Sequence, residues 1–297
     1  MINKIFLNAL RISILIGVFV YIFNNYSLLL SLENINYSFF GITIFLKLIG
    51  VLIIGYLNYY IFKQLYEKIS FFYILKIHTV SLLGNFFSFA KSGTAYKAVS
   101  LKNTYNINYK DFSIFFVVSQ ILTLMVVSFV AFFYVFLYSP HKEIGYFFIF
   151  LITGITIILY ISRLFFYKAG KNYVLEIFFN LKKIIFLILI QSISLLNNLI
   201  FNWTLSNSIG YKLNFFDNII YTFVSSFSVF ISLTPNALGI KEFFLTNLEF
   251  IAELDPEFLL NLSISERITD VLMLLISLLI FKLGGNKIKI QNNNKYD

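Results

Sequence analysis

Long apolar stretches alternate with short polar ones along the whole chain. Each apolar stretch has about 20 residues, enough for a helix to cross a hydrocarbon core roughly 30 Å thick. The eight stretches cover residues 7–30, 39–62, 71–90, 112–138, 144–161, 184–205, 215–233 and 258–281. No polar block of the size of a soluble domain separates them. The pattern predicts an all-α, polytopic helical membrane protein, with residues 1–297 forming a single integral membrane domain.

The basic residues of the loops predict how the chain is threaded, because cytoplasmic loops are rich in Lys and Arg. Lys4 and Arg11 place the N-terminus inside. The loop after residue 90 is basic and fits the inside, whereas the acidic loop 242–257 fits the outside. Both loops obey this rule if segments 71–90 and 215–233 each enter the membrane and return to the side from which they entered. We therefore expect six full spans, two re-entrant segments and cytoplasmic N- and C-termini, in the cytoplasmic membrane.

The two re-entrant segments would enter from opposite sides, which is typical of an inverted repeat. Residues 119–123 (Ser-Gln-Ile-Leu-Thr) resemble residues 265–269 (Ser-Glu-Arg-Ile-Thr), and Gly93 corresponds to Gly239 at the same offset. This pattern predicts repeat halves over residues 1–140 and 141–297, with a site at their interface.

Composition narrows the functional classes. Hydrophobic residues make up 59% of the chain and charged residues 12%, and the mean hydropathy is +0.83, so a soluble protein is excluded. Cys is absent and there are only two His, so we expect no metal site, no cofactor and no cysteine nucleophile. The net charge of +9 lies mainly in the short loops, which argues for membrane topology and not for nucleic acid.

Polar residues interrupt the chain directly after each predicted re-entrant segment. Irregular backbone at membrane depth is tolerated inside protein or beside a water-filled cavity, and a helix that starts there aims N–H groups at an anion. The predicted lipid head-group residues are Lys91, Ser92, Gly93, Tyr96, Lys97, Pro235, Asn236, Gly239, Lys241 and Glu242.

Charged residues also lie within the last apolar segment. Glu266, Arg267 and Asp270 would each cost roughly 2.5–3.5 kcal/mol at mid-bilayer, so we expect them to be paired. Arg267 reaches Asp270 at i, i+3, and Lys47 is a second candidate partner. With Gln120, these residues form the predicted intramembrane polar group, which either fixes helix packing or lines a polar cavity.

The two breaks resemble the motifs of the lysylphosphatidylglycerol synthase transmembrane-domain family, the flippase-like membrane half of the multiple-peptide-resistance proteins and their stand-alone relatives. Pro235, Gly239 and Glu242 match its Pro-Gly-Gly-x-Gly-x-x-Glu signature, and Gly93 and Lys97 match its Pro-x-x-x-Gly-Glu-x-x-Arg region. The sequence departs from the family pattern at Ala90, Thr94, Gln120, Asn236 and Ala237.

The resemblance implies lipid translocation without lipid synthesis, since no aminoacyl-transferase domain accompanies the membrane domain. We therefore expect a flippase or scramblase that moves an anionic or glycosylated lipid, and not an enzyme. Its expected partners are membrane lipids, either an anionic phospholipid or a lipid-linked sugar, with homo-oligomers and cell-envelope biosynthesis proteins as further alternatives. Two other functions stay open: a membrane enzyme acting on polyprenyl-phosphate-linked substrates, and a non-transporting partner in envelope polysaccharide assembly.

Overall fold

The computed structural model describes residues 35–66, 68–88, 91–138, 180–232, 234–247 and 255–284, together with residues 149 and 153. Within these ranges the chain forms helices and connecting turns, and no residue lies in a β-strand. The helices are α3 (Tyr37–Leu65), α4 (Phe71–Phe87), α5 (Ser92–Tyr105), α6 (Tyr109–Tyr138), α9 (Leu181–Ser208), α10 (Phe215–Ile231), α11 (Ile240–Thr246) and α13 (Pro256–Gly284), with a 3₁₀ turn, η2, at Pro235–Ala237. The prediction of an all-α protein is confirmed for this part of the chain.

Six of the eight predicted apolar segments coincide with helices of two distinct lengths. Helices α3, α6 and α9 are long and apolar enough to cross a membrane, and α13 is similar in length, with 29 residues. Helices α4 and α10 have 17 residues each. The predicted segments 7–30 and 144–161 lie outside the described residues, apart from residues 149 and 153.

Both predicted polar breaks interrupt helices, although the helices end slightly earlier than the apolar segments do. Helix α4 ends at Phe87 because the backbone becomes extended at Ser88, with φ −132° and ψ 154°. Lys91 then adopts the left-handed conformation, with φ 53°, directly before α5. A non-glycine residue in this region is uncommon and carries backbone strain.

The second break depends on a proline. Thr234 is extended, with φ −78° and ψ 155°, as expected for the residue before a proline. Asn236 then has φ 43° and Gly239 has φ 82°, so the chain turns twice before α11 begins. Proline and the left-handed residues together prevent α10 and α11 from forming one continuous helix.

Helices α4 and α5 form a tight hairpin through two glycines. A Cβ atom on Gly93 would lie 1.8 Å from the backbone oxygen of Ser81, and one on Gly84 would lie 2.6 Å from the Cα of Gly93. Such distances are far shorter than any real carbon contact, so both positions require glycine. The Asn85 side chain adds a second connection, because its Oδ1 accepts a hydrogen bond from the backbone N–H of Thr94 at 3.0 Å.

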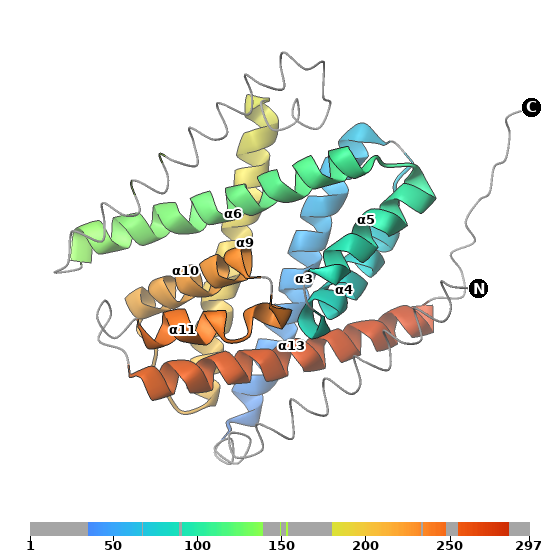
Figure 1. Cartoon of the computed structure of the whole chain (residues 1–297). Helices are drawn as coiled ribbons and strands as arrows, with labels where there is room; N and C mark the ends of the chain where they lie inside the picture. The colour runs from blue at the N-terminus through green and yellow to red at the C-terminus, as the bar shows by residue number, and fades with distance from the viewer. Residues whose placement is uncertain are drawn as a thin grey trace, which may run out of the picture.

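The described helices before residue 140 pack against those after residue 180 (Figure 1). Helices α3 and α9 contact each other along their lengths, while α6 and α13 lie on opposite sides of the two short-helix hairpins. Helix α4 contacts α13, which lies far from it in the sequence, and α10 contacts α6. The breaks after α4 and α10 therefore meet in the interior, where α4 also contacts η2.

Candidate functional site

A cavity of about 180 Å³, with both polar and apolar side chains in its wall, lies between the α4–α5 hairpin, α3, α6 and α9. We call it the lysine cavity, because Lys91 and Lys97 are the charged residues in its wall. Its neutral polar wall consists of Asn58, His78, Ser81, Asn85, Thr94, Ser119, Gln120, Thr123 and Gln191. Lys97 is only 6% exposed, and its Nζ lies 5.6 Å from the centre of the Phe115 ring. No Asp or Glu among the described residues forms an ion pair with either lysine.

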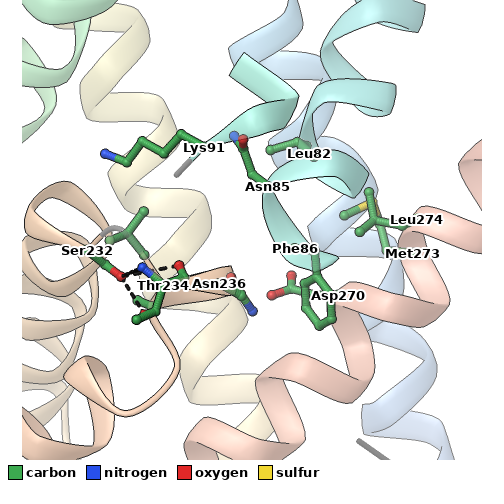
Figure 2. Close-up of a pocket in the computed structure, with 12 residues that line it drawn as sticks. Leu82, Asn85, Phe86, Lys91, Ser232, Thr234, Asn236, Asp270, Met273 and Leu274 are labelled. Carbon is green, nitrogen blue, oxygen red and sulfur yellow. Dashed lines mark hydrogen bonds between the residues drawn. The ribbon is translucent and has the colours of Figure 1, made fainter. Parts of the chain in front are cut away.

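A second cavity, of about 170 Å³, adjoins the first. We call it the joining cavity, because Lys91 and Asn85 line both cavities and its other wall comes from η2 and α13. Figure 2 shows Lys91 and Asn85 on one side of it, with Asn236 and Asp270 facing each other on the other side. Lys91 Nζ donates a hydrogen bond of 3.1 Å to the backbone oxygen of Phe230. One lysine therefore connects the break after α4 with the end of α10.

A cluster of six charged side chains lies beside the joining cavity. We call it the charged network; its members are Lys47 of α3, Lys241 and Glu242 of α11, and Glu266, Arg267 and Asp270 of α13. Three are cations and three are anions, so the network is neutral as a whole. Because the side chains retain only 4–24% of their exposure, this pairing is what makes their burial tolerable.

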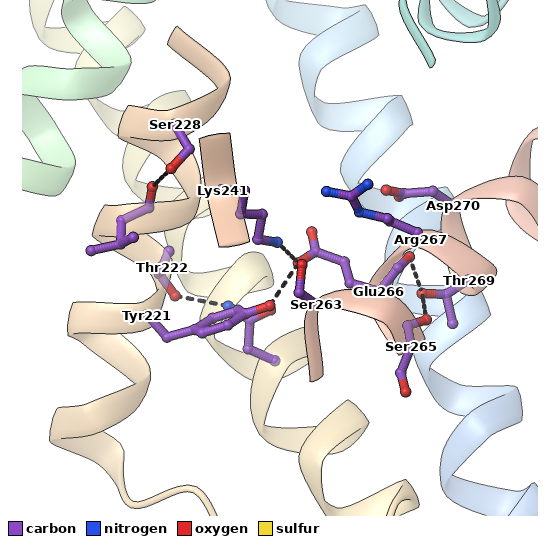
Figure 3. Close-up of polar contacts among 12 residues, drawn as sticks. Tyr221, Thr222, Ser228, Lys241, Ser263, Ser265, Glu266, Arg267, Thr269 and Asp270 are labelled. Carbon is purple, nitrogen blue, oxygen red and sulfur yellow. Dashed lines mark hydrogen bonds and ion pairs between the residues drawn. The ribbon is translucent and has the colours of Figure 1, made fainter. Parts of the chain in front are cut away.

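Glu266 is the most highly connected member of the charged network. Lys47 Nζ lies 3.1 Å from Glu266 Oε1 and 2.8 Å from Asp270 Oδ1. Lys241 pairs with the other oxygen of Glu266, and the Tyr221 hydroxyl donates to that same oxygen at 3.1 Å. Figure 3 shows Lys241 and Tyr221 both directed at Glu266. The network thus joins α3, α10, α11 and α13 at one carboxylate.

Arg267 pairs with Glu242 of α11, so the predicted pair of Arg267 with Asp270 on the same helix is wrong. Glu242 also accepts hydrogen bonds from Ser263 Oγ at 3.0 Å and from the backbone N–H of Gly239 at 2.8 Å. The i, i+3 rule considers only residues on the same helix, so it misses the pair of Arg267 with Glu242 of α11. The predicted contact between Lys47 and Asp270 is confirmed.

The predicted head-group residues separate into three groups. Lys91, Lys97 and Asn236 line a cavity, as does Gln120 of the predicted intramembrane group. Lys241 and Glu242 belong to the charged network instead. The remaining five residues line neither cavity. Ser92, Gly93, Pro235 and Gly239 lie at the two breaks, and Tyr96 is half-buried on α5.

Several cavity residues were not singled out from the sequence. His78, Ser81 and Asn85 lie at i, i+3 and i+7, which places them on one face of the otherwise apolar α4. That spacing is a readable signal for a polar wall. Gln191 of α9 is 3% exposed, and its Oε1 has no hydrogen-bond partner among the described residues. Nothing in the local sequence distinguishes this amide from a buried structural one.

Membrane-length apolar helices around a buried polar centre define this chain as a polytopic helical membrane protein. It belongs to the family described as the lysylphosphatidylglycerol synthase TM region, whose match covers residues 8–277. The resemblance predicted from the two breaks is thereby confirmed. No curated protein and no solved structure matches the chain significantly. Membership of this family places the protein among membrane proteins of lipid and envelope processes.

Proposed function

We propose that this protein moves a lipid with an anionic or glycosylated head group between the leaflets of the cytoplasmic membrane. The observation that carries this proposal is a pair of adjoining cavities beside membrane-length helices. Their walls contain polar side chains and two lysines that lack acidic partners among the described residues. A head group that crosses a bilayer needs a polar surface, because hydrocarbon offers it no hydrogen bonds. The cavities provide such a surface, and the lysines attract negative charge.

The size of the cavities limits what enters them. Sites for whole small molecules typically measure about 300–1,000 Å³, whereas the lysine cavity measures about 180 Å³. It therefore accommodates a head group while the acyl chains remain in the surrounding lipid. Exposed apolar side chains on α9, such as Ile193, Leu196 and Ile200, suit contact with those chains.

The short helices support the proposal of two re-entrant segments. With 17 residues, α4 and α10 are each about 26 Å long at 1.5 Å per residue, shorter than a hydrocarbon core of roughly 30 Å. Each is followed by a break and by a helix that packs back against it. Six full spans and two such hairpins would leave both termini in the cytoplasm.

The order of helix lengths supports an inverted repeat. Helices α3, α4, α5 and α6 have 29, 17, 14 and 30 residues, and α9, α10, α11 and α13 have 28, 17, 7 and 29. The packing is reciprocal as well, since the first helix of each hairpin contacts the long helix of the other half. In this arrangement the joining cavity lies at the interface of the repeats.

Cysteine labelling tests the threading, because the chain has no native Cys. We expect Lys102→Cys to react with a membrane-impermeant maleimide only from the cytoplasm, and Asn247→Cys only from outside. Labelling of both from the same side would replace the re-entrant arrangement with eight full spans.

Transport itself is tested with purified protein in vesicles that contain fluorescent lipids, using a membrane-impermeant quencher to follow movement between leaflets. Hydrogen bonds to charged groups contribute about 1.5–3 kcal/mol, so Lys97→Gln should slow translocation about 10- to 100-fold. Lys102→Gln is the matched control, because it makes the same change on the same helix outside both cavities. Equal rates for all three proteins, or no movement above empty vesicles, would refute the proposal.

A further inference from the structure

The wall of the lysine cavity has charge of one sign only. Lys91 and Lys97 line it, and no Asp or Glu does. The nearest carboxylate in the joining cavity, Asp270, is already paired with Lys47 at 2.8 Å. Aromatic rings near the lysine Nζ atoms, at 5.6 Å for Phe115 and 5.8 Å for Phe116, attract a cation without neutralising it. The two lysines therefore have no anionic partner in the cavity wall, and the wall has no carboxylate that could pair with an amine.

The rest of the polar wall suits hydroxyl groups. Gln191 Oε1 is a buried acceptor with no partner among the described residues, and a buried unsatisfied polar atom costs about 1–3 kcal/mol. Gln191 and Gln120 line the cavity from α9 and α6, and Asn58 lines it from α3. Amides donate and accept, as hydroxyls do, so they match a glycerol or sugar group.

We infer that the lysine cavity selects a head group that combines an anionic phosphate with neutral hydroxyls, and that it disfavours head groups with a free amine. This inference rests on the proposed lipid translocation and specifies its substrate class. The phosphate lies near Lys91 and Lys97, and the hydroxyls reach the amides. An ammonium group in the same position would face two like charges and no free carboxylate, which is how a site rejects a competing ligand.

Three fluorescent lipids, labelled on the acyl chain and placed in phosphatidylcholine vesicles, separate the contributions of the phosphate, the hydroxyls and the amine. Phosphatidylglycerol has an anionic phosphate and hydroxyls, phosphatidic acid has the phosphate alone, and phosphatidylethanolamine adds an amine. The expected order of translocation rates is phosphatidylglycerol, phosphatidic acid, phosphatidylethanolamine. One or two hydrogen bonds correspond to about a fivefold to tenfold difference between the first and the last.

Two substitutions at Gln191 test the assignment within the cavity. Gln191→Leu removes the unpartnered acceptor and should lower the phosphatidylglycerol rate to that of phosphatidic acid, without slowing phosphatidic acid. Gln191→Glu adds a carboxylate and should raise the phosphatidylethanolamine rate while lowering that of phosphatidylglycerol. This reversal is a gain for one probe, so a misfolded variant cannot imitate it. Lys102→Gln serves as the control and should keep the original order.

The outcomes separate this inference from the proposed function. If all three probes move at equal rates, or phosphatidylethanolamine moves fastest, translocation stands and the selectivity is refuted. The same holds if Gln191→Leu slows phosphatidylglycerol and phosphatidic acid alike and Gln191→Glu leaves the order unchanged. If no probe moves above empty vesicles, the translocation function fails, and the head-group assignment fails with it.

Discussion

The charged network and the lysine cavity lie near each other and differ in whether their buried charges are paired. In the network, three cations meet three anions, and Glu266 alone contacts Lys47, Lys241 and Tyr221. In the cavity, Lys97 is as deeply buried as Lys241, at 6% and 5% exposed, yet has no acidic partner among the described residues. Equal burial with unequal pairing indicates different roles. Paired charges hold helices together, whereas an unpaired charge beside a cavity remains available to a ligand.

The two regions also differ in what maintains their shape. The network connects four helices through ion pairs and hydrogen bonds. The cavity wall depends on backbone contact, since Gly84 and Gly93 allow α4 and α5 to approach closely, and on the Asn85–Thr94 hydrogen bonds. Removing one charge of a pair should therefore damage the network, and adding volume should damage the cavity.

The largest effect should come from adding one methyl group to the hairpin. Gly93→Ala places a Cβ 1.8 Å from the backbone oxygen of Ser81, so α4 and α5 must separate. We expect a loss of more than about 4 kcal/mol of stability, visible as little monodisperse protein in detergent. Gly41→Ala on α3 is the control, because its Cβ would meet nothing within 4 Å. Normal yield and melting temperature for Gly93→Ala would contradict the close approach.

The next largest effect should come from unpairing the charged network. Arg267→Met strands Glu242 and should cost about 3–5 kcal/mol, whereas removing both charges should be nearly neutral. The double variant Arg267→Met with Glu242→Gln keeps an oxygen for the backbone N–H of Gly239. We expect melting temperatures in detergent to show a low value for the single variant and recovery in the double one. Additive losses would mean that the two residues do not stabilise each other.

A substitution that removes charge from the lysine cavity should leave stability unchanged or raise it. Lys97→Met removes a buried ammonium that has no acidic partner, so the melting temperature should stay the same or rise, by up to about 1–3 kcal/mol in stability. Lipid translocation should be lost in the same preparation. A marked fall in the melting temperature would show that Lys97 is structural, as the members of the charged network are.

The smallest effect concerns the backbone of Lys91. Its φ of 53° is strained for any residue with a Cβ, so Lys91→Gly should be more stable than Lys91→Ala by about 1–2 kcal/mol. Both variants lack the ammonium group and its hydrogen bond to Phe230, so the comparison isolates the backbone. Denaturation of the two proteins side by side measures the difference, and equal stability would argue against the left-handed conformation.

The sequence predicts local features well and remote contacts poorly. Pro235 and Gly239 marked the second break correctly, because proline and glycine act on their own backbone. Lys47 was identified as a partner of Asp270 because an intramembrane charge needs a counter-charge. Arg267 was misassigned since a neighbour on its own helix is visible in sequence and Glu242 on another helix is not. Gln191 was missed for the same reason: its importance arises from the other helices that line the cavity around it.

The position of three charged residues in α13 has a consequence for biosynthesis. A helix that carries Glu266, Arg267 and Asp270 inserts poorly alone, because each charge opposes transfer into lipid by roughly 2.5–3.5 kcal/mol. Its main compensating cation, Lys47, lies 219 residues earlier than Glu266 and is already in place on α3 when α13 leaves the ribosome. Helix α13 therefore depends on partners made long before it. A lesion at Lys47 would appear first as failed membrane integration of α13, during synthesis.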